Sequence, residues 1–544
     1  MRQTYVYLQP HPPHRYSVLS TQRLLYPNIF YPPASSFQST KRTSQGAMSS
    51  RSQRQRYVSS CSCLSTLRVI VDHRPHTTSI HILDDDSLLN IFHLYRPSLL
   101  GEDQGVDARI AGGGRWSGEC WWYGLAHVCQ RWRDLILASA SYLGLCLVCT
   151  YRTPVAYMLA HSPPLPLAID YIGRDIAAED EEGIILALEQ RDRVRRIRLS
   201  LPVLKLQKLI MTMDGEYPTL EYLILANTSK EKGTISILPE TLETPRLRHL
   251  AIDCSIPIRF QSLTTAAGLV TLSLALHHPS TYFQPAVILQ SLSLMPKLEI
   301  LAIVFHFVVT NRDVERQLMR TPIMTHVTHP SLRLFAFQVD SVYSEAVLSR
   351  ITAPRLENLQ ISYPRQLTYS VPKFVQFIGR TKSLKFNRAE FHFDSKRVYV
   401  YVKAREANMP LPAFSIVVNC SHLDWQVSSM AQIFNALGQI LSVVEHLTLL
   451  HKVHSQSSEE HNEVDRAEWH KLLRSFGKVK TLRIHRRLAG ELSRCLRLDD
   501  GDHALELLPE LQELTYSGSG NANSFTPFID ARQNAGRPIT LIKS

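Results

Sequence analysis

The chain has 544 residues, of which 44% are hydrophobic and 20% charged, a balance typical of globular proteins and not of disordered ones. No apolar run reaches the eighteen residues that a membrane-spanning helix needs, and no signal-peptide core is visible, so we expect a soluble protein. The net charge is +12, but residues 1–80 alone carry +9, which argues against a nucleic-acid-binding surface on the rest of the chain.

The nine cysteines are odd in number and irregularly spaced, which fits no extracellular disulfide framework. Cys146 and Cys149 have the spacing of a zinc pair. The sequence has no second cysteine pair that could complete a zinc site, and the neighbouring residues are apolar, so buried thiols are the better interpretation. We therefore expect a reducing compartment, cytoplasmic or nuclear.

Residues 1–64 are rich in Ser, Arg and Pro, and we expect a disordered basic tail there. Two alternatives stay open: a mitochondrial transit peptide, and translation that begins at Met48. The run Leu67–Val71 predicts a short strand or lead-in to a helical module over residues 65–150.

Two apolar helix faces define that module. Leu88, Ile91, Phe92 and Tyr95 follow helical spacing, after aspartates that favour a helix start. A second stripe has steps of four and three residues and predicts another helix: Trp121, Leu125, Val128, Trp132 and Leu135. These faces can pack on each other as a helical hairpin or present apolar surface to a partner.

The residues Leu83 and Leu88–Phe92, followed by Val128–Leu135, closely resemble the F-box, the adaptor-binding module of SCF-type ubiquitin ligases. The family usually has proline where Asp84 stands, and a shorter join than the one between Arg96 and Cys120. The resemblance implies docking of a Skp-type adaptor on eight residues: Leu83, Leu88, Ile91, Phe92, Val128, Cys129, Trp132 and Leu135.

From residue 151 onward a short helix alternates with a short strand, and the strands share the spacing L-x-x-L-x-L. Its twelve copies start at Val194, Leu220, Leu247, Leu269, Leu298, Leu332, Leu356, Thr381, Leu411, Val444, Val479 and Leu511. The starts are 22 to 35 residues apart, which resembles the leucine-rich repeat.

Six copies place a proline two residues before the first apolar position, where it stops a preceding helix: Pro218, Pro245, Pro296, Pro330, Pro354 and Pro509. A single unit is too small to be stable, so the units must stack. We expect an irregular α/β solenoid over residues 151–544, with a parallel sheet on one face, helices on the other, and loop insertions at Ser455–Glu463 and Asp499–Asp502. Thr526-Pro527, Gly536 and the strand-like end predict a cap near residues 525–544.

No motif predicts an enzyme, a cofactor or a metal site. The acidic groups Glu179–Glu182 and Asp499–Asp502 read as solvated turns. His277, His278 and His461 read as surface residues. The basic runs Arg191–Arg198 and His485–Arg487 should face solvent beside strands, where they could favour an acidic partner.

From about residue 65, the arrangement looks like that of the F-box-like proteins expanded in mushroom-forming fungi. This resemblance implies a non-catalytic substrate receptor of a cullin-RING ubiquitin ligase, which holds an unidentified protein target on its repeats. Changing Phe92 and Trp132 to alanine together should then abolish adaptor binding and leave the repeats folded. Two alternatives stay open: a repeat scaffold whose helices only cap the solenoid, and a tail that binds nucleic acid.

Overall fold

The structure is a computed structural model. It describes residues 82–96, 121–172, 176–228, 238–239, 241–254, 267–307, 316, 323–364, 366, 368–404, 412–452, 465–497, 507–517 and 522–543. The predicted tail, the run Leu67–Val71, His461 and the two predicted loop insertions lie outside these residues.

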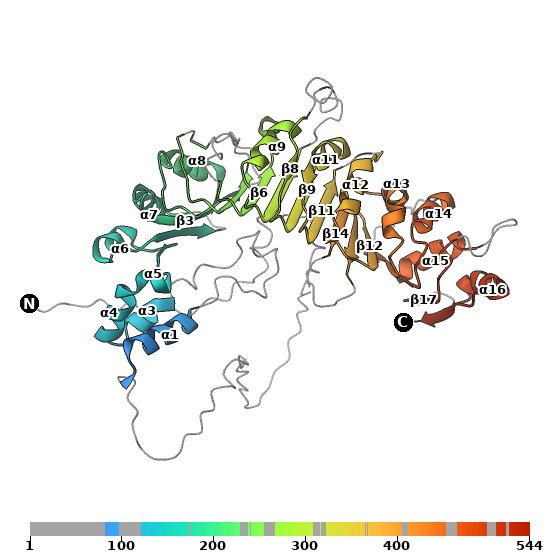
Figure 1. The fold of residues 1–544 in the computed structure, drawn as a ribbon, viewed down its shortest axis with the longest axis horizontal. Coiled ribbons are helices and arrows are strands. Elements are labelled where there is room, and N and C mark those ends of the chain that lie inside the picture. Colours follow the sequence, from blue (N-terminus) through green and yellow to red (C-terminus); the bar gives the residue numbers. More distant parts are fainter. Residues whose placement is uncertain are drawn as a thin grey trace, which may run out of the picture.

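The described chain is a mixed α/β structure built on one long, open and mostly parallel sheet (Figure 1). The strands lie in the order β1-β2-β3-β4-β5-β6-β7-β9-β11-β14-β13-β12-β15-β16-β17-β18. Their bounds are β1 Leu147–Cys149, β2 Leu167–Ile172, β3 Val194–Leu201, β4 Tyr222–Asn227, β5 His249–Cys254, β6 Thr271–Leu276, β7 Ile300–Phe305, β9 Leu334–Gln338, β11 Asn358–Tyr363, β12 Arg388–Asp394, β13 Val398–Lys403, β14 Phe414–Val418, β15 His446–Lys452, β16 Thr481–Ile484, β17 Glu513–Tyr516 and β18 Thr540–Lys543. A separate small pair joins β8 Val327–Thr328 to β10 Ile351–Thr352.

Helices follow one another along one side of this sheet (Figure 1). They are α6 Val155–His161, α7 Ala178–Glu189, α8 Val203–Thr212, α9 Pro285–Ser293, α11 Ser341–Leu348, α12 Pro372–Arg380, α13 Leu423–Leu441, α14 Arg466–Arg474, α15 Arg486–Cys495 and α16 Thr526–Asn534, with the 3-10 turns η6 Pro279–Thr281 and η7 Ala522–Phe525. Local sequence sets where they begin: α9, α12 and α16 have proline in the first turn, and Asp340 accepts the Tyr343 N–H at the start of α11.

A smaller group of helices lies at the β1 end of the sheet (Figure 1). It comprises α1 Asp85–Tyr95, α3 Trp121–Ala126, α4 Gln130–Ala138 and α5 Ala140–Leu143. We call these helices, residues 82–96 and 121–144, the helical module.

Eleven of the twelve L-x-x-L-x-L copies put their second and third apolar residues on strands of the sheet. The prediction for the copy at Thr381 is wrong. Leu384 and Phe386 lie in the approach to β12, and the inward residues of that strand are Ala389, Phe391 and Phe393. The parallel pairing is otherwise confirmed. The helix–strand alternation is confirmed only in part, because within the described residues no helix stands between β4 and β5 or between β5 and β6.

The departure from the parallel pattern is a reversal of three strands. After β11 the chain forms β12, returns antiparallel as β13, and only then places β14 beside β11. The long helix α13 then leads on to β15, which pairs with β12. Three consecutive strands therefore stand in the opposite spatial order from the rest, which the sequence analysis did not predict.

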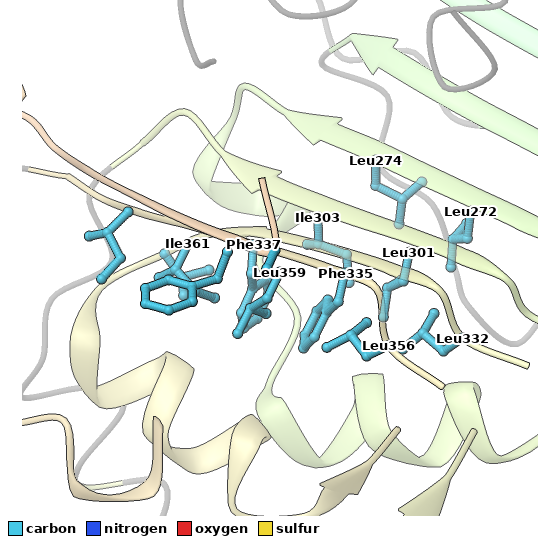
Figure 2. Packing of buried hydrophobic residues seen from close by; sticks show 14 of the residues in the cluster. Leu272, Leu274, Leu301, Ile303, Leu332, Phe335, Phe337, Leu356, Leu359 and Ile361 are labelled. Atoms are coloured by element: carbon cyan, nitrogen blue, oxygen red, sulfur yellow. The ribbon is translucent and has the colours of Figure 1, made fainter. Parts of the chain in front are cut away.

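The core is a continuous cluster between the sheet and its helices that runs from Leu88 in the module to Ile539 near the C-terminal end. Figure 2 shows its central part, where the inward residues of β6, β7, β9 and β11 stack from strand to strand: Leu272, Leu274, Leu301, Ile303, Phe335, Phe337, Leu359 and Ile361. Side chains alternate between the two faces of a strand. The residues between these therefore lie on the face opposite the helices.

The six recurrent prolines each occupy the second position of a tight turn. In each of these six copies the first apolar residue donates its N–H to the carbonyl three residues earlier, as Leu220 does to Tyr217 and Leu298 does to Met295, over 3.0 to 3.5 Å. Proline's fixed φ suits that position of a turn. It therefore turns the chain into the strand, and does not only stop a helix as we expected.

The C-terminal end follows the prediction, with α16 beginning at Thr526, Gly536 in the left-handed region at φ 74°, and β18 as the last strand. Both Cys146 and Cys149 are buried free thiols, as predicted. Where the chain is described, none of its helices is long and apolar enough to span a bilayer.

Arg532 fixes this end of the sheet. Its guanidinium is fully buried and donates to the carbonyls of Leu508, Pro509 and Leu511 over 3.1 to 3.3 Å. Leu508 has φ 49°, a strained value for a leucine. One side chain therefore holds the turn that leads into β17.

We expect Arg532→Ala to lower the free energy of unfolding by roughly 2–3 kcal/mol, because buried carbonyls lose their donor. Chemical denaturation of purified protein measures this. Arg537→Ala, which changes an exposed arginine five positions on, is the control and should have little effect. Equal losses for the two variants would contradict the assigned role.

Candidate docking surface

The first helix of the module, α1, begins at a side-chain cap. The Asp84 carboxylate accepts the Ser87 N–H at 2.6 Å, and this hydrogen bond lowers the pKa of the carboxyl group. The backbone of Asp84 has φ −68°, the value to which proline is restricted. The backbone at this position therefore has a φ that proline could also adopt, and aspartate adds a cap.

Arg131 ties the start of α1 to the start of α4. Its guanidinium donates to Asp85 Oδ1 from Nε at 3.1 Å and from Nη2 at 2.7 Å. The same Nη2 reaches the Leu83 carbonyl at 2.7 Å. Leu83 and Asp85 are thus held against α4 although they are 46 or more residues away in sequence.

The second predicted helix is broken, which corrects the continuous stripe expected from Trp121 to Leu135. The chain leaves helical geometry after Ala126, and Cys129 is extended at φ −159°, ψ 170° where α4 starts. The break changes the inward face, so that the buried residues are Trp122 and Ala126 on α3 and Trp132 and Ile136 on α4.

The centre of the module is an aromatic pair. Phe92 and Trp132 meet edge to face with ring centroids 4.9 Å apart, an arrangement that aromatic pairs favour. Leu88 is fully buried one turn before Phe92. The two predicted faces do pack on each other through these residues.

The eight predicted docking residues fall into three groups. Leu88, Phe92 and Trp132 are 0%, 1% and 9% exposed, so their side chains offer little or no surface to a partner in this arrangement. Leu83, Cys129 and Leu135 are half-buried, and Ile91 and Val128 are exposed. The structure therefore leaves only part of the predicted set available at the surface.

An exposed apolar stripe remains on α1. Ile91, Leu94 and Tyr95 are 45%, 83% and 63% exposed, and they lie on one side of the helix at spacings of three and four residues. Ile82 and Val128 add exposed apolar side chains on the same module. Leu94 was not among the residues predicted from the sequence, although its spacing from Ile91 places it on the same side of the helix.

The module also packs on the sheet. The Trp122 indole N–H donates to the Cys146 carbonyl at 3.3 Å, and Leu143 and Leu145 continue the buried core from α5 to β1. A hollow of about 590 Å³ between α1 and residues 138–142 is lined by Asp86, Leu89, Asn90, Ala138, Ser139, Ser141 and Tyr142.

Two charged groups differ from the expectation of solvated surfaces. Asp180 in the acidic cluster lies in the first turn of α7, where it is buried and accepts the Arg152 N–H at 2.7 Å. Arg198 in the basic run is also buried, in an ion pair with Asp170. His277 is exposed, as predicted, and its Nε2 lies 2.7 Å from Asp253 Oδ1.

Within the described residues, no group of three or more His, Cys, Asp or Glu side chains has an arrangement that could hold a metal ion. On the helical module, the most prominent surface feature is the exposed apolar stripe on α1.

No protein-family model matches the chain, and a search of curated proteins finds no match either.

Proposed function

We propose that this protein is a non-catalytic substrate receptor of an SCF-type ubiquitin ligase. In this proposal the helical module is an F-box-like module that docks a Skp-type adaptor, and the long sheet with its helices acts as a leucine-rich-repeat-like solenoid that holds a protein target. The observation that carries it is the exposed stripe Ile91, Leu94 and Tyr95, in a module whose sequence resembles the F-box. Large exposed apolar side chains that gather on one face mark interaction surfaces.

The mechanism is proximity. The adaptor joins the receptor to a cullin-RING ubiquitin ligase, while the sheet keeps the target near the site of ubiquitin transfer. Two binding sites on one chain raise the local concentration of one partner near the other. Other subunits supply the chemistry.

A second candidate function is a repeat scaffold that engages no ubiquitin ligase. The observation that favours it is the continuity of the core between the module and the sheet, with Trp122 bonded to Cys146. In that case the module only covers the β1 end of the sheet and its exposed stripe has no adaptor to bind.

The stripe can be tested without damage to the core. Ile91→Glu together with Leu94→Glu should reduce recovery of a Skp-type adaptor in affinity purification by roughly tenfold or more, because two charges would have to be desolvated in the interface. Both side chains are exposed, so the module should stay folded, which circular dichroism checks.

The matched control is Leu204→Glu, which changes a leucine on α8 that is 74% exposed and distant in sequence from the module. It should recover as much adaptor as the parent protein. If the parent recovers no adaptor, or the stripe variant recovers as much as the parent, the ligase function is wrong and the scaffold is favoured.

A further inference from the structure

One row of side chains crosses the face of the sheet opposite the helices, beginning next to the module. The strand register aligns its members as Val148 on β1, Ala168 on β2, Arg196 on β3, Tyr222 on β4, His249 on β5 and Thr271 on β6. Cys146, Val148 and Ala168 form a small apolar cluster at one end of the row. The row therefore changes from apolar to cationic and aromatic within a few strands.

The middle of the row is a stack. The Arg196 guanidinium lies 4.8 Å from the centroid of the Tyr222 ring. The Tyr222 and His249 rings are parallel within 10° at 4.2 Å, and His249 Nδ1 lies 3.1 Å from Thr271 Oγ1. These contacts hold the groups in one orientation, so that they form a rigid platform.

Arginine side chains outnumber carboxylates around this platform. The carboxylates of Asp170 and Glu221 both form ion pairs. Asp170 is bonded to Arg198, and Glu221 is bonded to Arg195 at 3.0 Å. Arg196 itself is half-buried. Arg248 is the residue immediately before β5, which begins at His249, and it is exposed.

Arg96, at the end of α1, extends the positive charge from the module. Its guanidinium lies against Gly144, where an added Cβ would come within 3.1 Å of it. We call Arg96, Arg196 and Arg248 the basic corner.

Burial dominates the pKa shifts of the nearby groups, and neighbouring positive charges add to them. Burial, and then the charges of Arg248 and Arg196, lower the pKa of His249 to about 4. Burial is also the main cause that lowers the pKa of Arg196, and the charge of Arg96 acts in the same direction while Glu221 opposes it. An anion placed here would relieve the repulsion between like charges.

We propose that the basic corner and the stack beside it bind an acidic peptide segment of the target, with its Asp and Glu side chains against Arg96, Arg196 and Arg248. Arginine matches carboxylates because its planar fork can donate two parallel hydrogen bonds. The apolar cluster and the ring stack provide a flat surface for the peptide between its charges. This inference rests on the proposed function, since it names the chemistry of the target that the receptor holds.

The test uses the full chain and a labelled peptide of alternating Glu and Ser, followed by fluorescence anisotropy. The parent protein should bind it saturably, and binding should weaken as salt rises. Arg248→Glu should weaken binding by roughly tenfold or more, and Arg96→Gln should weaken it in the same direction. The exposed position of Arg248 keeps loss of folding from explaining the result.

The matched control is Arg483→Glu, which changes an exposed arginine on β16 near the other end of the sheet by the same charge. It should leave peptide binding unchanged. An equal loss in this control would overturn the proposal, because net charge and not the basic corner would then explain binding. Failure of the parent to bind would overturn it too, as would a single-stranded RNA of equal length that displaces the peptide at lower concentration.

The outcome is separable from that of the adaptor experiment. Arg248→Glu should recover as much adaptor as the parent protein, since Arg248 belongs to the sheet and not to the exposed stripe on α1. Peptide binding without adaptor recovery would refute the ligase function and leave the basic corner standing. Adaptor recovery without peptide binding would do the opposite.

Discussion

Arg198→Ala should lower the free energy of unfolding by about 3–5 kcal/mol, the cost of leaving a buried charge without its partner. Arg198 donates to Asp170 through both Nε, at 2.8 Å, and Nη2, at 2.6 Å. The two side chains are only 3% and 10% exposed. Removing the arginine leaves the buried carboxylate of Asp170 without its partner on the face of β2 opposite the helices, and urea or guanidinium unfolding will detect the loss of stability.

The exposed pair Arg333–Glu357 is the control, because it has the same two-bond geometry at 3.0 and 2.9 Å but side chains that are 52% and 43% exposed. Arg333→Ala should cost about 1 kcal/mol or less, since solvent screens the pair. A double change, Asp170→Leu with Arg198→Met, should recover most of the lost stability because no charge is left buried. Equal losses for Arg198→Ala and Arg333→Ala would show that burial does not decide the cost.

Phe92→Ala or Trp132→Ala should each remove about 3–5 kcal/mol, because each creates a cavity at the centre of the module. The module is small, so that loss should unfold α1, α3 and α4 and leave β6 and β7, far along the sheet, protected. Hydrogen exchange followed by mass spectrometry resolves the two regions. Ile91→Ala is the control, since its side chain is 45% exposed and its loss leaves no comparable cavity.

Loss of adaptor recovery in the variant that combines Phe92→Ala with Trp132→Ala would follow from unfolding of the module. It would not identify the surface that the adaptor touches. If both variants kept the exchange protection of α1, the aromatic pair would not be the centre of the module.

Much of the sheet could be predicted from the sequence because its signal is local. Eleven strands place apolar residues inward at the second and third positions of the motif, and in six of them a tight turn with proline precedes the strand. Both features are visible in one short segment. The strand order of β12, β13 and β14 is not local, because it depends on which edge each strand finds after the chain has folded. Even so, Val398, Val400 and Val402 alternate with tyrosines, which could have predicted β13 as a strand.

The candidate docking surface was predicted less well. The apolar spacing continues through Val128, so the sequence carries no clear sign that the helix breaks there and that the inward face changes. The composition of a stripe also does not say which of its members are covered. Phe92 and Trp132 are the largest side chains of the set, and they are used for packing inside the module, while Ile91 and Leu94 remain outside.

A further signal went unnoticed in the sequence. The residue after the first apolar position of the motif is often charged, and along the sheet these residues are Arg195, Glu221, Arg248, Glu299, Arg333, Glu357, Glu445 and Lys480. Three neighbouring pairs form ion pairs in the structure: Arg195–Glu221, Arg333–Glu357 and Glu445–Lys480. The alternation of sign supports the alignment of one repeat with the next.

The reversal of β12, β13 and β14 has a consequence for the order in which the molecule assembles. Elsewhere each newly synthesised strand can pair at once with the strand before it, so the sheet can grow strand by strand from the first unit. This sequential addition is interrupted at β11, because the next two strands, β12 and β13, do not pair with β11. Only β14 pairs with that edge, and it is synthesised after them. The β12–β13 hairpin therefore has to form before it joins the rest of the sheet. The chain must then make α13 before β15 can pair with the other edge of β12. We expect folding in two separate stages with a pause between them, and the unpaired edge of β11 is where a nascent chain is most exposed to wrong partners.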